Sequence, residues 1–145
     1  YGNLRLPRSA VQGRHPVAGE HAGFQDALAG FGLRYSITSG ALAAQSVLEN
    51  RSYEQLWRRL LLPRMKAGIV NRFIFNSIGT TGRHWVTAKL MQANTGERLH
   101  KLYAASSLHA MLFPAAERRL RRGLHDPSCD HQDCTCVWCE HGTAF

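Results

Sequence analysis

The chain has 145 residues, of which 44% are apolar and 19% are charged, and its formal net charge is +8. This length leaves room for one core, or a core and a tail, and excludes two full enzyme domains. The composition excludes an intrinsically disordered chain, and no apolar run approaches the roughly 20 residues of a membrane-spanning helix. Because Tyr1 begins the sequence and no leader-like segment follows, we expect an excerpt of a longer protein or a processed product.

Positive charge is concentrated in the body of the chain. Residues 1–123 hold all eighteen Lys and Arg and six of the ten acids, which gives this segment a net charge of +12. Such a body attracts phosphate groups, anionic lipid or an acidic partner chain, and charge alone does not choose among them. Nucleic acid is the least favoured partner, since Trp57, Trp85 and Trp138 are scattered rather than interleaved with the cations.

The first 32 residues predict extended structure that leads into a loop. Residues 1–19 read as extended segments, with a turn at Gly13 and a short buried strand over residues 15–19. Glycines stand at positions 19, 23, 30 and 32. Their spacing indicates a loop that needs unusual backbone angles or the close approach of another backbone.

A helical period begins at residue 31 or 32 and continues to about residue 49. One stripe of this helix is apolar, and a second stripe of small residues lets another backbone or a flat ligand approach closely. The apolar stripe consists of Leu33, Ile37, Ala41, Ala44 and Leu48, and the small-residue stripe of Ser36, Ser39, Gly40 and Ala43. Ser52 followed by Gln55 is a capping-box signal for the next helix, which we expect to end at Pro63.

Helices are predicted for most of the remaining body. Residues 64–93 favour helix with a break at 79–82, and another helix is expected from residue 94 or 95 to residue 113. Pro114 then fits the first turn of a short helix that ends before Gly123. The last turns of that helix carry Arg118, Arg119, Arg121 and Arg122. We favour a solvated helix end for this cluster over a contact with anionic lipid.

The clearest chemical signal lies in residues 17–34, VAGEHAGFQDALAGFGLR. A strand delivers Gly19 and Glu20, a glycine-containing loop follows, and a long helix opens at residues 30–32. The carboxylate can accept hydrogen bonds from sugar-like hydroxyls, while the helix start offers unpaired N–H groups with about half a positive charge. Glycines there remove side chains that would keep a ligand away from those groups. This pattern favours an elongated anionic cofactor over a plain strand-to-helix connection.

Residues 15–48 resemble the second flavin motif of FAD-dependent oxidoreductases of the glutathione-reductase type. The geranylgeranyl reductase, lycopene cyclase and FAD-dependent monooxygenase branches are the most similar. By motif, Gly19 and Glu20 stand where the family has the Gly-Asp pair that contacts the ribityl chain of FAD. Ala22 and Gly23 continue the loop, and Gly30, Phe31, Gly32 and Leu33 stand at the helix start that points at the flavin pyrimidine edge.

The resemblance implies an FAD-dependent oxidoreductase that takes hydride from NAD(P)H and reduces or monooxygenates a small apolar molecule. The dinucleotide fingerprint G-x-G-x-x-G does not occur in these 145 residues. An N-terminal Rossmann half, on the same protein or on another chain, is therefore the expected partner, and this segment alone is expected not to hold FAD. No residue presents itself as an obligatory acid or base, so we name no catalytic residue.

All four cysteines lie in the C-terminal tail, as Cys129, Cys134, Cys136 and Cys139. The spacing C-x4-C-x-C-x2-C suits one tetrahedral Zn²⁺, and His131 or His141 could replace one thiolate. A tail of reduced, unliganded thiols is the alternative, and a disulfide framework is disfavoured because the body holds no cysteine. We therefore expect a reducing compartment, the cytoplasm, with peripheral contact to a membrane as an option.

These observations divide the chain into three segments. Residues 1–50 are expected to form the second half of an FAD-binding fold, residues 51–123 a C-terminal helical region, and residues 124–145 a Cys/His-rich tail. The expected fold class is mainly α with a short β segment at the N-terminus, as the C-terminal portion of an α/β, Rossmann-like fold. A small basic zinc-binding module that recruits an anionic partner is the alternative function, since it needs only the tail and the arginines.

Overall fold

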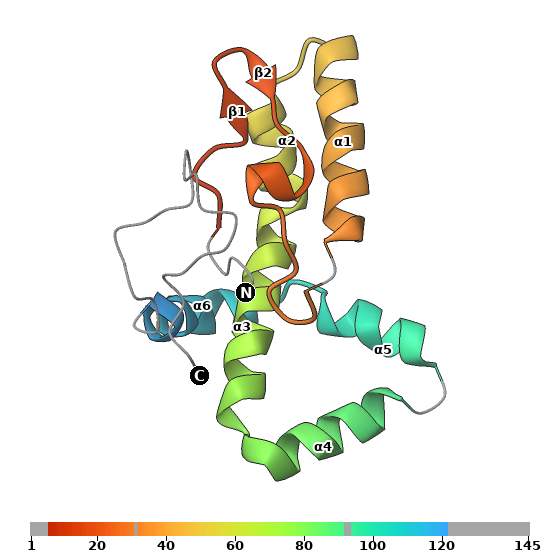
Figure 1. The fold of residues 1–145 in the computed structure, drawn as a ribbon, viewed down its shortest axis with the longest axis vertical. Helices are drawn as coiled ribbons and strands as arrows, with labels where there is room; N and C mark the ends of the chain where they lie inside the picture. Colours follow the sequence, from red (N-terminus) through yellow and green to blue (C-terminus); the bar gives the residue numbers. More distant parts are fainter. Residues whose placement is uncertain (1–5, 31, 92–93, 122–145) are drawn as a thin grey trace.

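The computed structural model describes residues 6–30, 32–91 and 94–121 (Figure 1). This part of the chain is mainly helical, with a short antiparallel hairpin near its N-terminus, as the sequence predicts. The elements are β1 (Val11–Gln12), β2 (His15–Pro16), the 3₁₀ helix η1 (Gly19–Ala22), α1 (Leu33–Leu48), α2 (Tyr53–Leu60), α3 (Leu62–Ser77), α4 (Gly79–Leu90), α5 (Thr95–Leu102) and α6 (Ser107–Arg121).

The hairpin of β1 and β2 turns at Gly13, whose backbone is left-handed with φ +60°. Its strands pair antiparallel, with Val11 opposite Pro16. The predicted strand over residues 15–19 is shorter in the structure, since β2 ends at Pro16. The backbone stays extended through Ala18, with φ −119° and ψ 163°, and Gly19, with φ +69°, begins η1.

Helix α1 has the bounds that the sequence predicts, but its apolar stripe faces outward. The side chains of Leu33, Ile37 and Leu48 are 72%, 64% and 85% exposed. The buried residues of the helix are Tyr35, Ser39, Leu42 and Ser46. Asn50, with φ +49°, then lets the chain leave the helix.

A first core lies between the loop, α1, α2 and the start of α3. Trp57, Tyr35 and Phe24 are almost fully buried there, and the Phe24 and Trp57 rings meet edge to face at 5.3 Å. Helix α2 begins at the predicted cap, since the Ser52 Oγ accepts a hydrogen bond from the Gln55 N–H at 3.4 Å. This core joins residues from both sides of residue 50.

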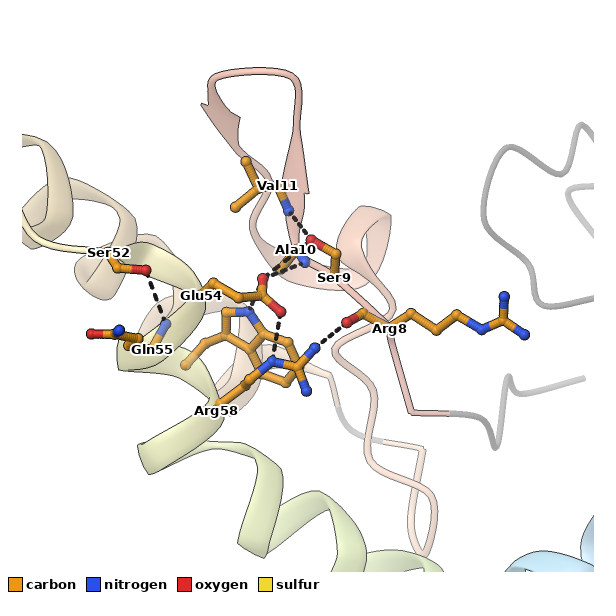
Figure 2. Close-up of polar contacts among 9 residues, drawn as sticks. Arg8, Ser9, Ala10, Val11, Ser52, Glu54, Gln55 and Arg58 are labelled. Atoms are coloured by element: carbon orange, nitrogen blue, oxygen red, sulfur yellow. Dashed lines mark hydrogen bonds and ion pairs between the residues drawn. The ribbon is translucent and has the colours of Figure 1, made fainter.

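Glu54 ties the hairpin strand to α2 (Figure 2). Its Oε2 accepts hydrogen bonds from the Ala10 N–H at 3.2 Å and the Trp57 Nε1–H at 2.9 Å, and its Oε1 accepts one from Arg58 at 2.6 Å. Ser9 donates to the same carboxylate at 3.2 Å. Burial alone would raise the pKa of Glu54, but these donors outweigh it and hold the pKa below its usual value.

Pro63 starts a helix rather than stopping one. Helix α2 ends at Leu60, and α3 begins at Leu62 with Pro63 in its first turn. A proline is tolerated there because the first turn has no intrahelical acceptor for its missing N–H. The prediction that Pro63 ends α2 is therefore wrong, because α2 already ends at Leu60 and Pro63 belongs to the next helix.

The break predicted at residues 79–82 is confined to its first residue. Gly79 has φ +66° and follows the Ile78 cap of α3, while the chain from Gly79 onward continues as α4. One residue with a left-handed backbone suffices to redirect the chain, so the remaining small residues stay helical.

The predicted helix from residue 94 to residue 113 is two helices. The Asn71 side chain donates to the Leu102 carbonyl at 2.6 Å, which satisfies the end of α5, and the Ser106 Oγ caps the start of α6 by accepting from the His109 N–H. Pro114 lies inside α6 and not in its first turn, which is a further correction. The carbonyl left without a helical donor belongs to Ala110, which is exposed and open to water.

A second core lies where α3 meets α6. Its buried residues are Ala27, Ile69, Val70 and Ala116. Figure 1 shows α6 crossing α3 near its middle, on the side away from α4 and α5. Because Ala27 belongs to the loop that precedes α1, this second core also holds the middle of that loop in place.

Candidate functional site

The loop of residues 19–32 folds back on the first half of α1. The Gly19 N–H donates to the buried Ser39 Oγ at 2.8 Å, and a Cβ added at Gly19 would lie 3.2 Å from the Ser36 Oγ. The small-residue stripe of α1 therefore admits a close backbone, which is the backbone of this loop. Gly40 of the same stripe has nothing within 4 Å of such an added Cβ.

Glu20 and Gly32 lie together at the start of α1. Glu20 is exposed, and a Cβ added at Gly32 would collide with its carboxylate. Gly32 is the N-cap residue of α1 and is buried, and it has no side chain to bond to the N–H groups of the first turn. The exposed carboxylate of Glu20 and the positive end of a helix dipole thus meet beside Gly32.

The other predicted glycines serve the backbone of the loop. Gly23 ends η1 with φ +80°, and its N–H donates to the Glu20 carbonyl at 2.8 Å. Gly30 has φ +77°, and its N–H closes a turn by donating to the Asp26 carbonyl at 3.0 Å. Among the neighbouring predicted residues, Ala22 is half-buried and Leu33 is exposed, while Phe31 lies outside the described residues.

Asp26 is a residue of the site that sequence reasoning missed. It is 7% exposed, its Oδ1 accepts from the Leu28 N–H at 2.9 Å, and its Oδ2 accepts from the Tyr103 hydroxyl at 2.5 Å. Burial, and then the hydrogen bond to the Asp26 carboxylate, raise the pKa of Tyr103 above its usual range. The available signal was a single acid between Gly23 and Gly30, although nothing in the sequence named its distant partner.

Arg34 fastens the start of α1 to the same cluster. Its guanidinium carbon lies 4.9 Å from the ring centre of Tyr35 and 4.3 Å from that of Tyr103, and it donates to the Tyr35 hydroxyl at 3.2 Å. Burial raises the pKa of Tyr35, and the neighbouring guanidinium partly opposes this effect. The middle of the loop is therefore anchored through Asp26 and Tyr103, while Glu20 near its start stays exposed.

The predicted metal ligands cannot be placed. The residues Cys129, Cys134, Cys136, Cys139, His131 and His141 all lie outside the described residues. Within the described ranges, no three His, Cys, Asp or Glu side chains are grouped as they would be around a metal ion. No helix in those ranges combines the length and the apolar character of a membrane span.

Comparison with family models, with curated proteins and with solved structures finds no match for the chain.

Proposed function

We propose that the chain is part of an FAD-dependent oxidoreductase and forms the ribityl and pyrimidine side of the flavin site. The observation that carries this proposal is the meeting of Glu20 and Gly32 at the uncapped start of α1. Both residues belong to the motif that resembles the flavin family, although they stand twelve positions apart in the sequence.

The chemistry of this point suits the proposed cofactor. The exposed Glu20 carboxylate is an acceptor for the ribityl hydroxyls, and the N–H groups of the first turn of α1 are donors for a carbonyl oxygen of the flavin. A Cβ added at position 32 would lie too close to the Glu20 Oε1, so a side chain there would move the carboxylate away from the helix start. Gly19 presents its N–H to Ser39 instead, so it supports the loop rather than the cofactor.

The outward stripe of α1 supports the expectation of a missing half. Leu33, Ile37 and Leu48 expose a line of large apolar side chains that begins beside the proposed site. Contiguous apolar surface of this kind marks an interaction site in a folded protein. An N-terminal Rossmann half that supplies the pyrophosphate site would cover this stripe.

When bound, FAD would supply hydride transfer from NAD(P)H and the reduction or monooxygenation of a small apolar substrate. The residues of this chain would orient the flavin and tune its electronic properties. Glu20 fixes the sugar-like chain, and the positive end of the α1 dipole stabilises negative charge on the pyrimidine edge by up to about 1 kcal/mol at an exposed site. No described residue is assigned as a proton donor or acceptor in the reaction.

The test is an absorption spectrum of the full-length protein purified without added cofactor. We expect flavin bands that are lost in Gly32→Val, because the new side chain displaces the Glu20 carboxylate. Gly40→Ala is the matched control on the same helix, where an added Cβ meets nothing within 4 Å, and it should keep the bands. A colourless protein that does not take up added FAD would contradict the proposal.

A further inference from the structure

Helices α4 and α5 form an arm that contributes no residue to either hydrophobic core. Figure 1 shows α4 leaving the far end of α3 and α5 returning towards its middle. Neither helix contains a buried residue. We name the described residues of these two helices, 79–91 and 94–102, the α4–α5 arm.

The arm carries large apolar side chains on its surface. Trp85 is 62% exposed, Met91 is 76% exposed and Leu99 is 40% exposed. Trp85 is the only tryptophan of the described residues that is exposed, since Trp57 is fully buried. An exposed Trp that no core requires is typical of a binding surface, and its ring prefers the boundary between water and an apolar phase.

The same arm is basic. It carries Arg83, Lys89, Arg98 and Lys101 against the single acid Glu97, a net charge of +3. Lys101 and Glu97 form an exposed ion pair at 2.7 Å. The Lys89 Nζ lies 6.0 Å from the centre of the Trp85 ring, so a cation and an interfacial aromatic share one site. At Trp85, therefore, a cation and a large apolar side chain lie next to each other.

We infer that the α4–α5 arm is a docking surface for an anionic phospholipid bilayer. Cations close to an anionic surface are attracted to its headgroups, and a Trp and a Met beside them enter the interfacial region. A second copy of the chain fits less well, because it would oppose a charge of +3 with the same charge. Nucleic acid fits less well too, because a single exposed aromatic on the arm gives no stacking platform for successive bases.

This surface differs from the arginine cluster that the sequence singles out. Arg118 and Arg119 are exposed on α6, but that helix packs on α3 through the buried Ala116 and the half-buried Phe113. No residue of α4 or α5 is buried in this way. The inference does not depend on the flavin proposal.

The experiment compares two pairs of charge removals in the full-length protein. Arg83→Gln with Lys89→Gln removes two cations from the arm, and Arg118→Gln with Arg119→Gln removes two from α6; all four side chains are exposed, so the fold should survive. Flotation is measured with vesicles of phosphatidylcholine alone and of phosphatidylcholine mixed with phosphatidylglycerol. We expect binding to the mixed vesicles only, weakened about tenfold or more by the arm pair and about threefold at most by the α6 pair.

Fluorescence gives a second and independent readout. The emission of the full-length protein should move to shorter wavelength when mixed vesicles are added, and this shift should vanish in Trp85→Phe. Equal weakening by both charge pairs, or no binding to either vesicle, would overturn the inference. Binding of single-stranded nucleic acid without vesicle binding, weakened by the arm pair, would assign the arm to nucleic acid instead.

Discussion

Asp26 holds the loop at its middle and connects it to a distant helix end. Its carboxylate accepts one hydrogen bond from the Leu28 N–H inside the loop and another from Tyr103, 77 positions along the chain. Because the pKa of Tyr103 is raised, its hydroxyl keeps the proton that it donates across the neutral range. The position of Glu20 therefore depends on contacts that do not involve Glu20 itself.

Tyr103→Phe tests this dependence. It leaves the buried Oδ2 of Asp26 without its donor, so we expect the free energy of unfolding to fall by about 1–3 kcal/mol in urea denaturation. Tyr53→Phe is the matched control, since the Tyr53 hydroxyl donates to the neutral Val17 and Ser39 carbonyls, and its loss should be about 1 kcal/mol. If Tyr103→Phe lowers the free energy of unfolding equally in the wild-type chain and in Asp26→Asn, the loss does not come from the hydrogen bond between Tyr103 and Asp26.

At the scale of single elements, local sequence decided which predictions held. The bounds of α1 and the Ser52 cap were predictable because periodicity and capping act over three or four neighbouring residues. The break between α5 and α6 was not, since the donor that ends α5 is Asn71, 31 positions earlier. The outward direction of the α1 stripe was hidden for a similar reason, because periodicity shows that a stripe exists and not what covers it.

Glu54 of α2 bonds to Ser9 and Ala10, just before β1. Its lowered pKa predicts that the stability of the fold depends on pH. A carboxyl whose pKa is lower in the folded state stabilises the fold above about pH 5, and that contribution is lost as the pH falls through the lowered value. We therefore expect Glu54→Gln to cost about 1–2 kcal/mol at neutral pH and to flatten the acid limb of the stability profile.

A matched control for this experiment is Glu49→Gln. Glu49 also has a lowered pKa, through hydrogen bonds from Gln45 and Arg51, but it is fully on the surface. Its loss should leave both the stability and the acid limb unchanged within error, because water replaces its partners. An effect of equal size in the two variants would show that the contacts of Glu54 with Ser9 and Ala10 stabilise the fold no more than the surface contacts of Glu49 do.

At the scale of the whole molecule, two cores hold the described residues together while two surfaces stay open. Each core contains one residue of the loop, Phe24 in the first and Ala27 in the second. The open surfaces are the apolar stripe of α1 and the α4–α5 arm. The motif around Glu20 and Gly32 was visible in the sequence, whereas both open surfaces depend on tertiary packing and emerge only in the fold.

Ile37→Ser in the full-length protein tests whether the stripe is covered. In the described residues the Ile37 side chain is 64% exposed. If nothing covers it, Ile37→Ser should lower the free energy of unfolding by no more than about 0.5 kcal/mol. If a second half packs on the stripe, we expect a loss of about 2 kcal/mol or more in thermal or urea unfolding. Met111→Ser, on α6 and 70% exposed, is the control away from the stripe and should stay near the lower value.

The bond between Asp26 and Tyr103 also sets an order of events during synthesis. A ribosome releases the loop and α1 well before residue 103, so a nascent chain can form the small-residue contact of Gly19 with Ser39 early. The buried carboxylate gains its donor only after the later helices have emerged and folded back. The loop is thus expected to reach its final shape late, and a cofactor would find its place complete only once most of the chain has left the ribosome.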